Sequence, residues 1–241
     1  MNLYLHAIMF QNFDLNQLII KLATLLFAVT IHEVAHGYVA YRMGDNTALL
    51  AGRLTLNPIK HLDFVGSFLM PAILALSPAP FIFGYAKPVP VNFARLRDYR
   101  RGTIYVASAG VLANLALAII CGVLFRIMLN LELFQYNDFF RPFIIELFLL
   151  LGYSVMINIV LAIFNMLPVP PLDGSRVLAM FLPTRLRQQF VRLESFGIII
   201  IMFLLISNSL SSLFAFIPEL MHLLLGSDGL HLFLVLIGAF Q

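Results

Sequence analysis

The stretch QLIIKLATLLFAVTIHEVAHGYVAYRM, residues 17–43, indicates what kind of protein this chain can form. It is long and apolar enough to cross a bilayer, because a membrane-spanning helix needs about 20 predominantly apolar residues. It nevertheless contains three titratable side chains within five positions, His32, Glu33 and His36. Ionisable groups in an apolar helix are costly and by default indicate a functional site.

The spacing of these residues suits a metal site. Histidines at positions i and i+4 lie one above the other on a helix, so both imidazoles can reach one ion. The glutamate between them can take a proton from an attacking water. Two packed histidines beside a buried, partnered glutamate are the structural alternative. By composition alone, the HExxH pattern is expected only about 0.003 times in this chain, which favours metal binding.

The composition of the whole chain is typical of a membrane protein. Of its 241 residues 61% are hydrophobic and 11% charged, with a mean hydropathy of +0.94. A soluble domain is about 45–50% apolar and about 25% charged. A net charge of +3 without a basic stripe argues against nucleic-acid binding. The single cysteine, Cys121, excludes a disulfide-bonded scaffold.

Hydropathy predicts the other spans. The candidates are residues 17–43, 65–84, 103–130, 143–168 and 196–217, with a short sixth at 229–240 that could join 219–225 across Gly226. We expect an all-α polytopic membrane protein with about five or six transmembrane helices. It is predicted to form a single domain over 1–241, with a catalytic core at about 17–180 and C-terminal helices over 196–240.

The second candidate span is unusual because it contains Pro71, Pro78 and Pro80. Proline removes a hydrogen bond from a helix interior, so the segment is predicted to be broken or re-entrant. The basic loops 85–101 and 174–194 are predicted to be cytoplasmic. If the span 17–43 runs from outside to inside and loop 85–101 is cytoplasmic, residues 44–101 must cross the membrane an even number of times.

A catalytic zinc site needs three protein ligands and an open position. The third candidate is Asp173, which follows the prolines that end the 143–168 helix in NMLPVPPLDG, residues 165–174. Its structural alternative is the N-cap of the next helix. Alternation of polar and apolar residues over 53–57 also favours a small β-hairpin near the site, either an ordinary one or one that pairs with substrate.

Several other residues are predicted to have no chemical role. Gly110 and Asn114 share a helix face with Ala107, and small residues there allow helices to approach closely. His61 has no carboxylate or histidine at ligand spacing and is predicted to lie at the membrane interface. Cys121 is predicted to pack within a span.

The HExxH motif at 32–36 and the stretch NMLPVPPLDG at 165–174 resemble the motifs of the site-2 protease family of intramembrane zinc metalloproteases. The stretches GRLTLNP at 52–58 and AKPVPVN at 86–92 add to the resemblance, and the second is similar to the small branch without PDZ or CBS domains. The family often has Gly-Pro-x-x-Asn in the intervening helix, where this chain has Val111 in GVLAN.

The resemblance implies that His32, His36 and Asp173 bind one zinc ion per chain and that Glu33 is the base. It also implies that Asn165 helps to bind the substrate or the oxyanion, for which an interhelical hydrogen bond is the alternative.

We therefore predict an intramembrane zinc metalloprotease that hydrolyses peptide bonds within transmembrane segments of membrane-protein substrates. The expected location is a prokaryotic inner membrane, with the active site toward the cytoplasmic side. One alternative is a zinc-binding membrane protein without hydrolysis, such as a metal transporter or an inactive regulatory relative. Another is a membrane protease of the prenyl-protein type, whose third ligand is a glutamate; Glu146 is the only downstream candidate within a span.

Overall fold

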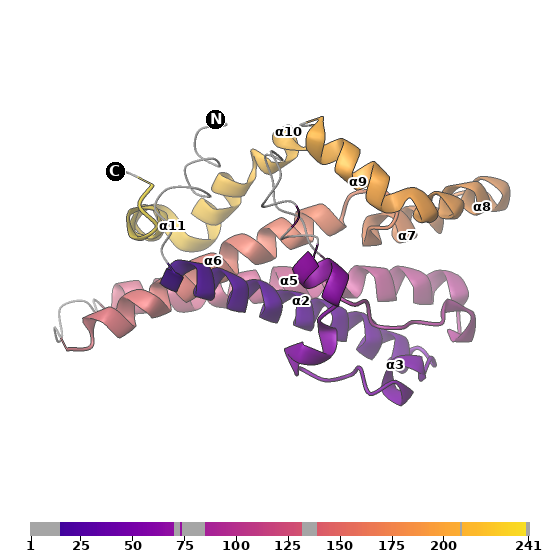
Figure 1. Cartoon of the computed structure of the whole chain (residues 1–241), viewed down its shortest axis with the longest axis horizontal. Helices are drawn as coiled ribbons and strands as arrows, with labels where there is room; N and C mark the ends of the chain where they lie inside the picture. The colour runs from indigo at the N-terminus through magenta and orange to yellow at the C-terminus, as the bar shows by residue number, and fades with distance from the viewer. Residues whose placement is uncertain (1–14, 70–72, 74–84, 132–138, 208, 240–241) are drawn as a thin grey trace. The chain divides into compact units, whose positions relative to one another are not determined.

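The computed structural model describes residues 15–69, 73, 85–131, 139–207 and 209–239. The three longest helices are α2 (Leu15–Arg42), α5 (Tyr99–Asn130) and α6 (Arg141–Asn165) (Figure 1). The shorter helices after α6 are α7 (Asp173–Ala179), α8 (Thr184–Arg192), η5 (Leu193–Phe196), α9 (Gly197–Ile206), α10 (Ser211–Phe214) and α11 (Ile217–Leu236). Between α2 and α5 lie α3 (Thr47–Leu50), η1 (Pro58–His61), η2 (Val65–Leu69) and η3 (Phe93–Arg95).

Five helical segments are long and apolar enough to cross a membrane. They are Leu15–Arg42, Tyr99–Asn130, Arg141–Asn165, Thr184–Ile206 and Ser211–Leu236. Their outer faces are apolar: Leu15, Ile19 and Leu22 on α2 are 58%, 56% and 55% exposed. A run of exposed aliphatic side chains along one helix suits lipid rather than water. The predicted all-α membrane fold is confirmed.

The described residues divide into two compact units. One comprises residues 1–28, 114–160 and 213–241, and the other comprises residues 29–113 and 161–212. Each of the three long helices contributes a part to both units. The predicted site residues all belong to the second unit, so the geometry of the site lies within one compact body.

The first unit is held by aromatic and amide contacts. Phe125 and Phe148 pack edge to face with ring centroids 4.9 Å apart. The Tyr153 hydroxyl donates to Gln17 Oε1 at 2.9 Å. Asn114 Nδ2 donates to Asn158 Oδ1 at 3.1 Å, and both residues are fully buried. Such interhelical amide bonds satisfy polar groups that lipid would leave unpaired.

The second unit packs the C-terminal half of α2 against the start of α5. Its apolar centre is Ala40, Leu96 and Val106. The chain between these helices folds over α2 without forming a strand in the described residues, although an extended segment at 85–92 crosses beside the site.

The hairpin expected at 53–57 is not formed. A strand needs a ladder of hydrogen bonds to neighbouring backbone. Here the Arg53 amide donates to Ala48 O, and the Thr55 carbonyl accepts from His61 Nε2 at 2.9 Å. The polar side chains also make loop contacts, since Thr55 Oγ1 accepts from the Asn57 amide and Asn57 Oδ1 accepts from the Ile59 amide. His61, for which we predicted no chemical role, is fully buried in this loop region.

The course of the Pro-rich segment lies outside the described residues, except for η2 before it and Tyr85 after it. The Tyr85 amide donates to the Gly66 carbonyl at 3.0 Å, and Ser67 Oγ donates to the Tyr85 carbonyl at 3.1 Å. Residues 66 and 85 are therefore neighbours, and the number of membrane crossings between residues 44 and 101 stays a prediction.

The C-terminal helices begin and end at other residues than hydropathy alone predicts. The helix expected over 196–217 ends at Ile206. On its N-terminal side it continues through η5 into α8, so the candidate span is Thr184–Ile206. The short predicted stretch that begins at residue 229 is joined to the preceding helix in α11, which ends at Leu236 and is kinked at Gly226, where φ is 79°.

Candidate metal centre

The two motif histidines project from the C-terminal half of α2 and are 7% and 9% exposed. His36 Nδ1 lies 2.6 Å from the Val106 carbonyl oxygen of α5. Because a carbonyl only accepts, Nδ1 carries the proton and Nε2 presents its lone pair. That Nε2 atom lies 2.9 Å from His32 Nε2. The two rings are edge to face, with centroids 4.6 Å apart.

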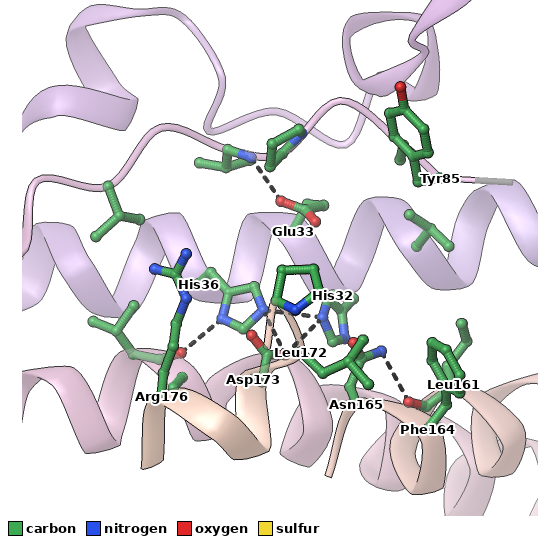
Figure 2. Close-up of a pocket in the computed structure, with 18 of the residues that line it drawn as sticks. His32, Glu33, His36, Tyr85, Leu161, Phe164, Asn165, Leu172, Asp173 and Arg176 are labelled. Carbon is green, nitrogen blue, oxygen red and sulfur yellow. Dashed lines mark hydrogen bonds and ion pairs between the residues drawn. The ribbon is translucent and has the colours of Figure 1, made fainter. Parts of the chain in front are cut away.

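Asp173 comes to these histidines from the start of α7. It is the first helical residue rather than the N-cap, which is Leu172. Its carboxylate is thus not used to cap the helix, and it lies beside the two imidazoles (Figure 2). Gly174 permits this placement, because a Cβ there would lie 2.1 Å from the Met166 carbonyl oxygen at the end of α6.

The three groups form a donor set that fits zinc. Asp173 Oδ2 lies 3.1 Å from His32 Nε2 and 3.2 Å from His36 Nε2. Tetrahedral zinc with ligand bonds of about 2.0–2.1 Å places its ligand atoms about 3.3–3.4 Å apart. Oδ2 is buried without a hydrogen-bond partner. A buried carboxylate oxygen and two imidazole nitrogens facing one point are what a cation would satisfy.

The electrostatics of the Asp173 carboxyl agree with a ligand role. Burial raises the pKa of this group, but hydrogen bonds and positive charge from the His32 and His36 imidazoles, when these rings are protonated, outweigh burial and hold the pKa well below its usual range. Asp173 is therefore ionised at neutral pH, as a metal ligand must be.

Glu33 reaches from α2 toward the extended segment (Figure 2). Its Oε2 accepts a hydrogen bond from the Val89 amide at 2.6 Å. A charge-assisted bond of this kind orients the carboxylate. The second oxygen, Oε1, is not used by this bond. Val89 could not be identified from the sequence, because a backbone amide leaves no signal in residue type.

Gly110, which we predicted to serve helix packing, lies directly against the rings of the two candidate metal ligands on α2. The sequence did not indicate that the packed atoms would be those of the histidines. A Cβ built at Gly110 would lie 2.5 Å from His32 Cε1, 2.5 Å from His36 Nε2 and 2.6 Å from His32 Nε2. Only a residue without a side chain fits there. The sequence signal for close packing here was the cluster of small residues on this face of α5.

We expect Gly110→Ala to displace one or both imidazoles, because its methyl group would overlap ring atoms within a rigid helix. Zinc affinity should fall about 10- to 100-fold, as it does when groups that orient ligands are removed. Metal titration followed by competition with a chelator measures this. Gly122→Ala is the control, since its Cβ would meet Leu224 at 3.1 Å, away from the metal ligands. Unchanged affinity in the Gly110 variant would contradict the assignment.

A cavity of about 550 Å³ adjoins these groups. Its lining includes the three candidate metal ligands, Glu33 and apolar side chains such as Val29, Leu161, Phe164, Ile198 and Ile201. Asn165 also lines it, and its Nδ2 donates to the Leu161 carbonyl one turn back in α6 at 2.9 Å. The bond that Asn165 makes is thus within its own helix and not the interhelical bond of the alternative, while the amide borders the cavity (Figure 2).

The group of potential metal ligands in the described residues consists of His32, His36 and Asp173. Glu146, the ligand required by the prenyl-protein alternative, is not among them. It lies near the start of α6, in the part of that helix that belongs to the first unit.

Comparison with known proteins finds relatives that are named putative zinc metalloproteases. Residues 143–207 match the model of Peptidase family M50. The chain is 38% identical over 184 residues to “Putative zinc metalloprotease YwhC” of Bacillus subtilis, covering 76% of this chain and 78% of that protein. Two proteins named Rip2 are 27% identical over 91% of this chain in Mycolicibacterium smegmatis and 24% identical over 81% in Mycobacterium tuberculosis. They cover 78% and 70% of those proteins. No solved structure matches the chain.

A polytopic helical protein with this donor set and these relatives is a zinc metalloprotease embedded in a lipid bilayer. More narrowly, the chain belongs to Peptidase family M50, the site-2 protease family that its motifs resemble. Its cofactor is zinc, which the His-His-Asp group fits.

Proposed function

We propose that this protein hydrolyses peptide bonds within transmembrane segments of other membrane proteins. The observation that carries the proposal is the position of the HExxH pair in α2, an apolar helix of 28 residues. A peptide bond can reach groups on such a helix only by entering the membrane region. The apolar walls of the adjoining cavity suit the side chains of a transmembrane segment.

The ligands proposed for zinc are His32 Nε2, His36 Nε2 and Asp173 Oδ2. When bound, zinc supplies a Lewis acid beside the scissile carbonyl and makes water nucleophilic near neutral pH. The Val106 carbonyl holds His36 in the tautomer that can ligate, and buried Gly110 leaves room for both rings.

Glu33 is proposed as the general base. With Oε2 occupied by the Val89 amide, Oε1 takes the proton from the attacking water and passes it to the leaving nitrogen. Asn165 is proposed to donate to the developing oxyanion or the substrate carbonyl from the cavity wall. It would have to give up or share its bond to Leu161.

A helical substrate hides its carbonyls, so we expect it to unwind before cleavage. Residues that destabilise a helix near the scissile bond should therefore speed the reaction. The loops 85–101 and 174–194 are rich in arginine, which supports a cytoplasmic placement of this end of the protein in a prokaryotic inner membrane.

The test is cleavage in reconstituted liposomes. Purified protein is mixed with single-span substrates with and without a glycine–proline pair in the cytoplasmic half of the span. Mass spectrometry of the products should place the cut within the span, and a zinc chelator should stop it until zinc is restored. Cuts confined to soluble loops would overturn the proposal.

The alternative of a zinc-binding protein without hydrolysis makes a different prediction. Transport would favour several ligand clusters along a path, whereas the described residues bring together one trio of potential ligands. Zinc flux into the same liposomes without any peptide cleavage would support transport.

A further inference from the structure

The extended segment 85–92, which contains the AKPVPVN motif, is fastened along its length. The Lys87 amide donates to the His61 carbonyl at 2.9 Å, and the Asn92 amide donates to Asp45 Oδ2 at 2.6 Å. Between these ties, the Val89 amide holds Glu33. Proline lacks an amide hydrogen and restricts the backbone, so Val89 has the one N–H among residues 88–90.

Arg53, from the GRLTLNP motif, binds the same segment from the other side. Its Nη2 donates to the Lys87 carbonyl at 2.7 Å and lies 3.4 Å from His61 Nδ1. Because a guanidinium can only donate, His61 Nδ1 accepts, and His61 Nε2 donates to the Thr55 carbonyl at 2.9 Å. Arg53 and His61 thereby satisfy both backbone groups of Lys87, two residues before Val89.

Burial of Arg53 is costly, which argues against a role in packing alone. The residue is 8% exposed, and its Nε has no hydrogen-bond partner among the described residues. None of the ion pairs among the described residues includes Arg53. A folded protein with a buried charge that has no carboxylate partner is usually less stable than one with an apolar side chain of similar volume at that position. The guanidinium is directed instead at one backbone carbonyl.

We propose that Arg53 is a positioning residue for Glu33. By fixing Lys87 it holds Val89 where the Val89 amide orients the Glu33 carboxylate. The inference rests on the proposed function, in which Glu33 is the base. It gives the two motif stretches one joint purpose, since GRLTLNP supplies the arginine and AKPVPVN supplies the amide.

Asp45 anchors the far end of the segment. Its Oδ1 accepts from the Thr47 amide at 3.0 Å, while Oδ2 holds Asn92. Burial raises the pKa of this carboxyl, but hydrogen bonds from Thr47 and Asn92 outweigh burial and lower it. Asp45 is therefore ionised at neutral pH, and the segment is held at both ends.

The test compares Arg53→Met, Arg53→Lys and the control Arg101→Met, which removes an arginine that is 78% exposed. We expect kcat of Arg53→Met to fall about 10- to 100-fold, because small displacements of catalytic groups cost that much. KM and zinc content should not change. Arg53→Lys retains a donor for the Lys87 carbonyl and should recover much of kcat, and Arg101→Met should match the wild type.

Hydrogen exchange in the zinc-free protein provides a readout that does not depend on activity. Amides of residues 85–92 should exchange faster in Arg53→Met, while those of α2 and α5 should be unaffected. Unchanged exchange in the segment would overturn the inference. A fall in kcat that is accompanied by loss of zinc and a rise in KM would also overturn it. A wild-type protein that cleaves nothing would instead overturn the proposed function, whereas an unimpaired Arg53→Met variant of an active enzyme would overturn this inference alone.

Discussion

Glu33→Gln should reduce kcat for an intramembrane substrate by about 10²- to 10⁴-fold, the usual contribution of a general acid–base group. The glutamine side-chain oxygen can still accept the hydrogen bond from the Val89 amide, so the side chain keeps its place in the structure. It cannot take up a proton at neutral pH. Zinc content should be unchanged, because Glu33 is not one of the three grouped ligands.

The measurement is single-turnover cleavage in liposomes, with metal content determined on the same preparation. Glu146→Gln is the matched control, since it makes the same change in another apolar helix. It should cleave like the wild type and retain zinc. A Glu33→Gln variant with wild-type cleavage would show that the base lies elsewhere, and loss of zinc in Glu146→Gln would favour the prenyl-protein alternative.

Much of the candidate metal centre could be predicted from sequence because its key spacing is local. His32 and His36 are one helical turn apart, so a single regular element brings them together. Asp173 is remote in sequence and was identified from its residue type and its place at the end of a span. The structure brings it to the histidines through Gly174 and the close approach of α7 to the end of α6.

The contacts that sequence analysis missed involve groups without a distinctive side chain. The Val106 carbonyl and the Val89 amide are present at almost any residue, and their use depends on how α5 and the extended segment pack against α2. Alternation over 53–57 was misleading for a similar reason. It describes where side chains point, but the backbone partner that makes a strand is a tertiary property.

Asp173→Asn should lower zinc affinity by more than about 100-fold, since even groups that only orient ligands contribute 10–100-fold. Asparagine has nearly the same shape, but it removes the negative charge that faces two imidazole nitrogens at 3.1 and 3.2 Å. Its amide hydrogens would also compete with the metal for those nitrogens. Competition with a fluorescent chelator measures the affinity, and Asp228→Asn, an exposed aspartate in α11, is the control.

The two substitutions together distinguish a protease from a protein that only binds zinc. Asp173→Asn should lose cleavage in proportion to zinc, and excess zinc should restore part of the activity. Glu33→Gln should stay inactive at every zinc concentration. If Asp173→Asn retained wild-type affinity, the third ligand would lie elsewhere. If added zinc restored neither occupancy nor cleavage, the change would have disrupted more than a ligand, because loss of one ligand weakens binding without altering His32 or His36, and the Val106 carbonyl still orients His36.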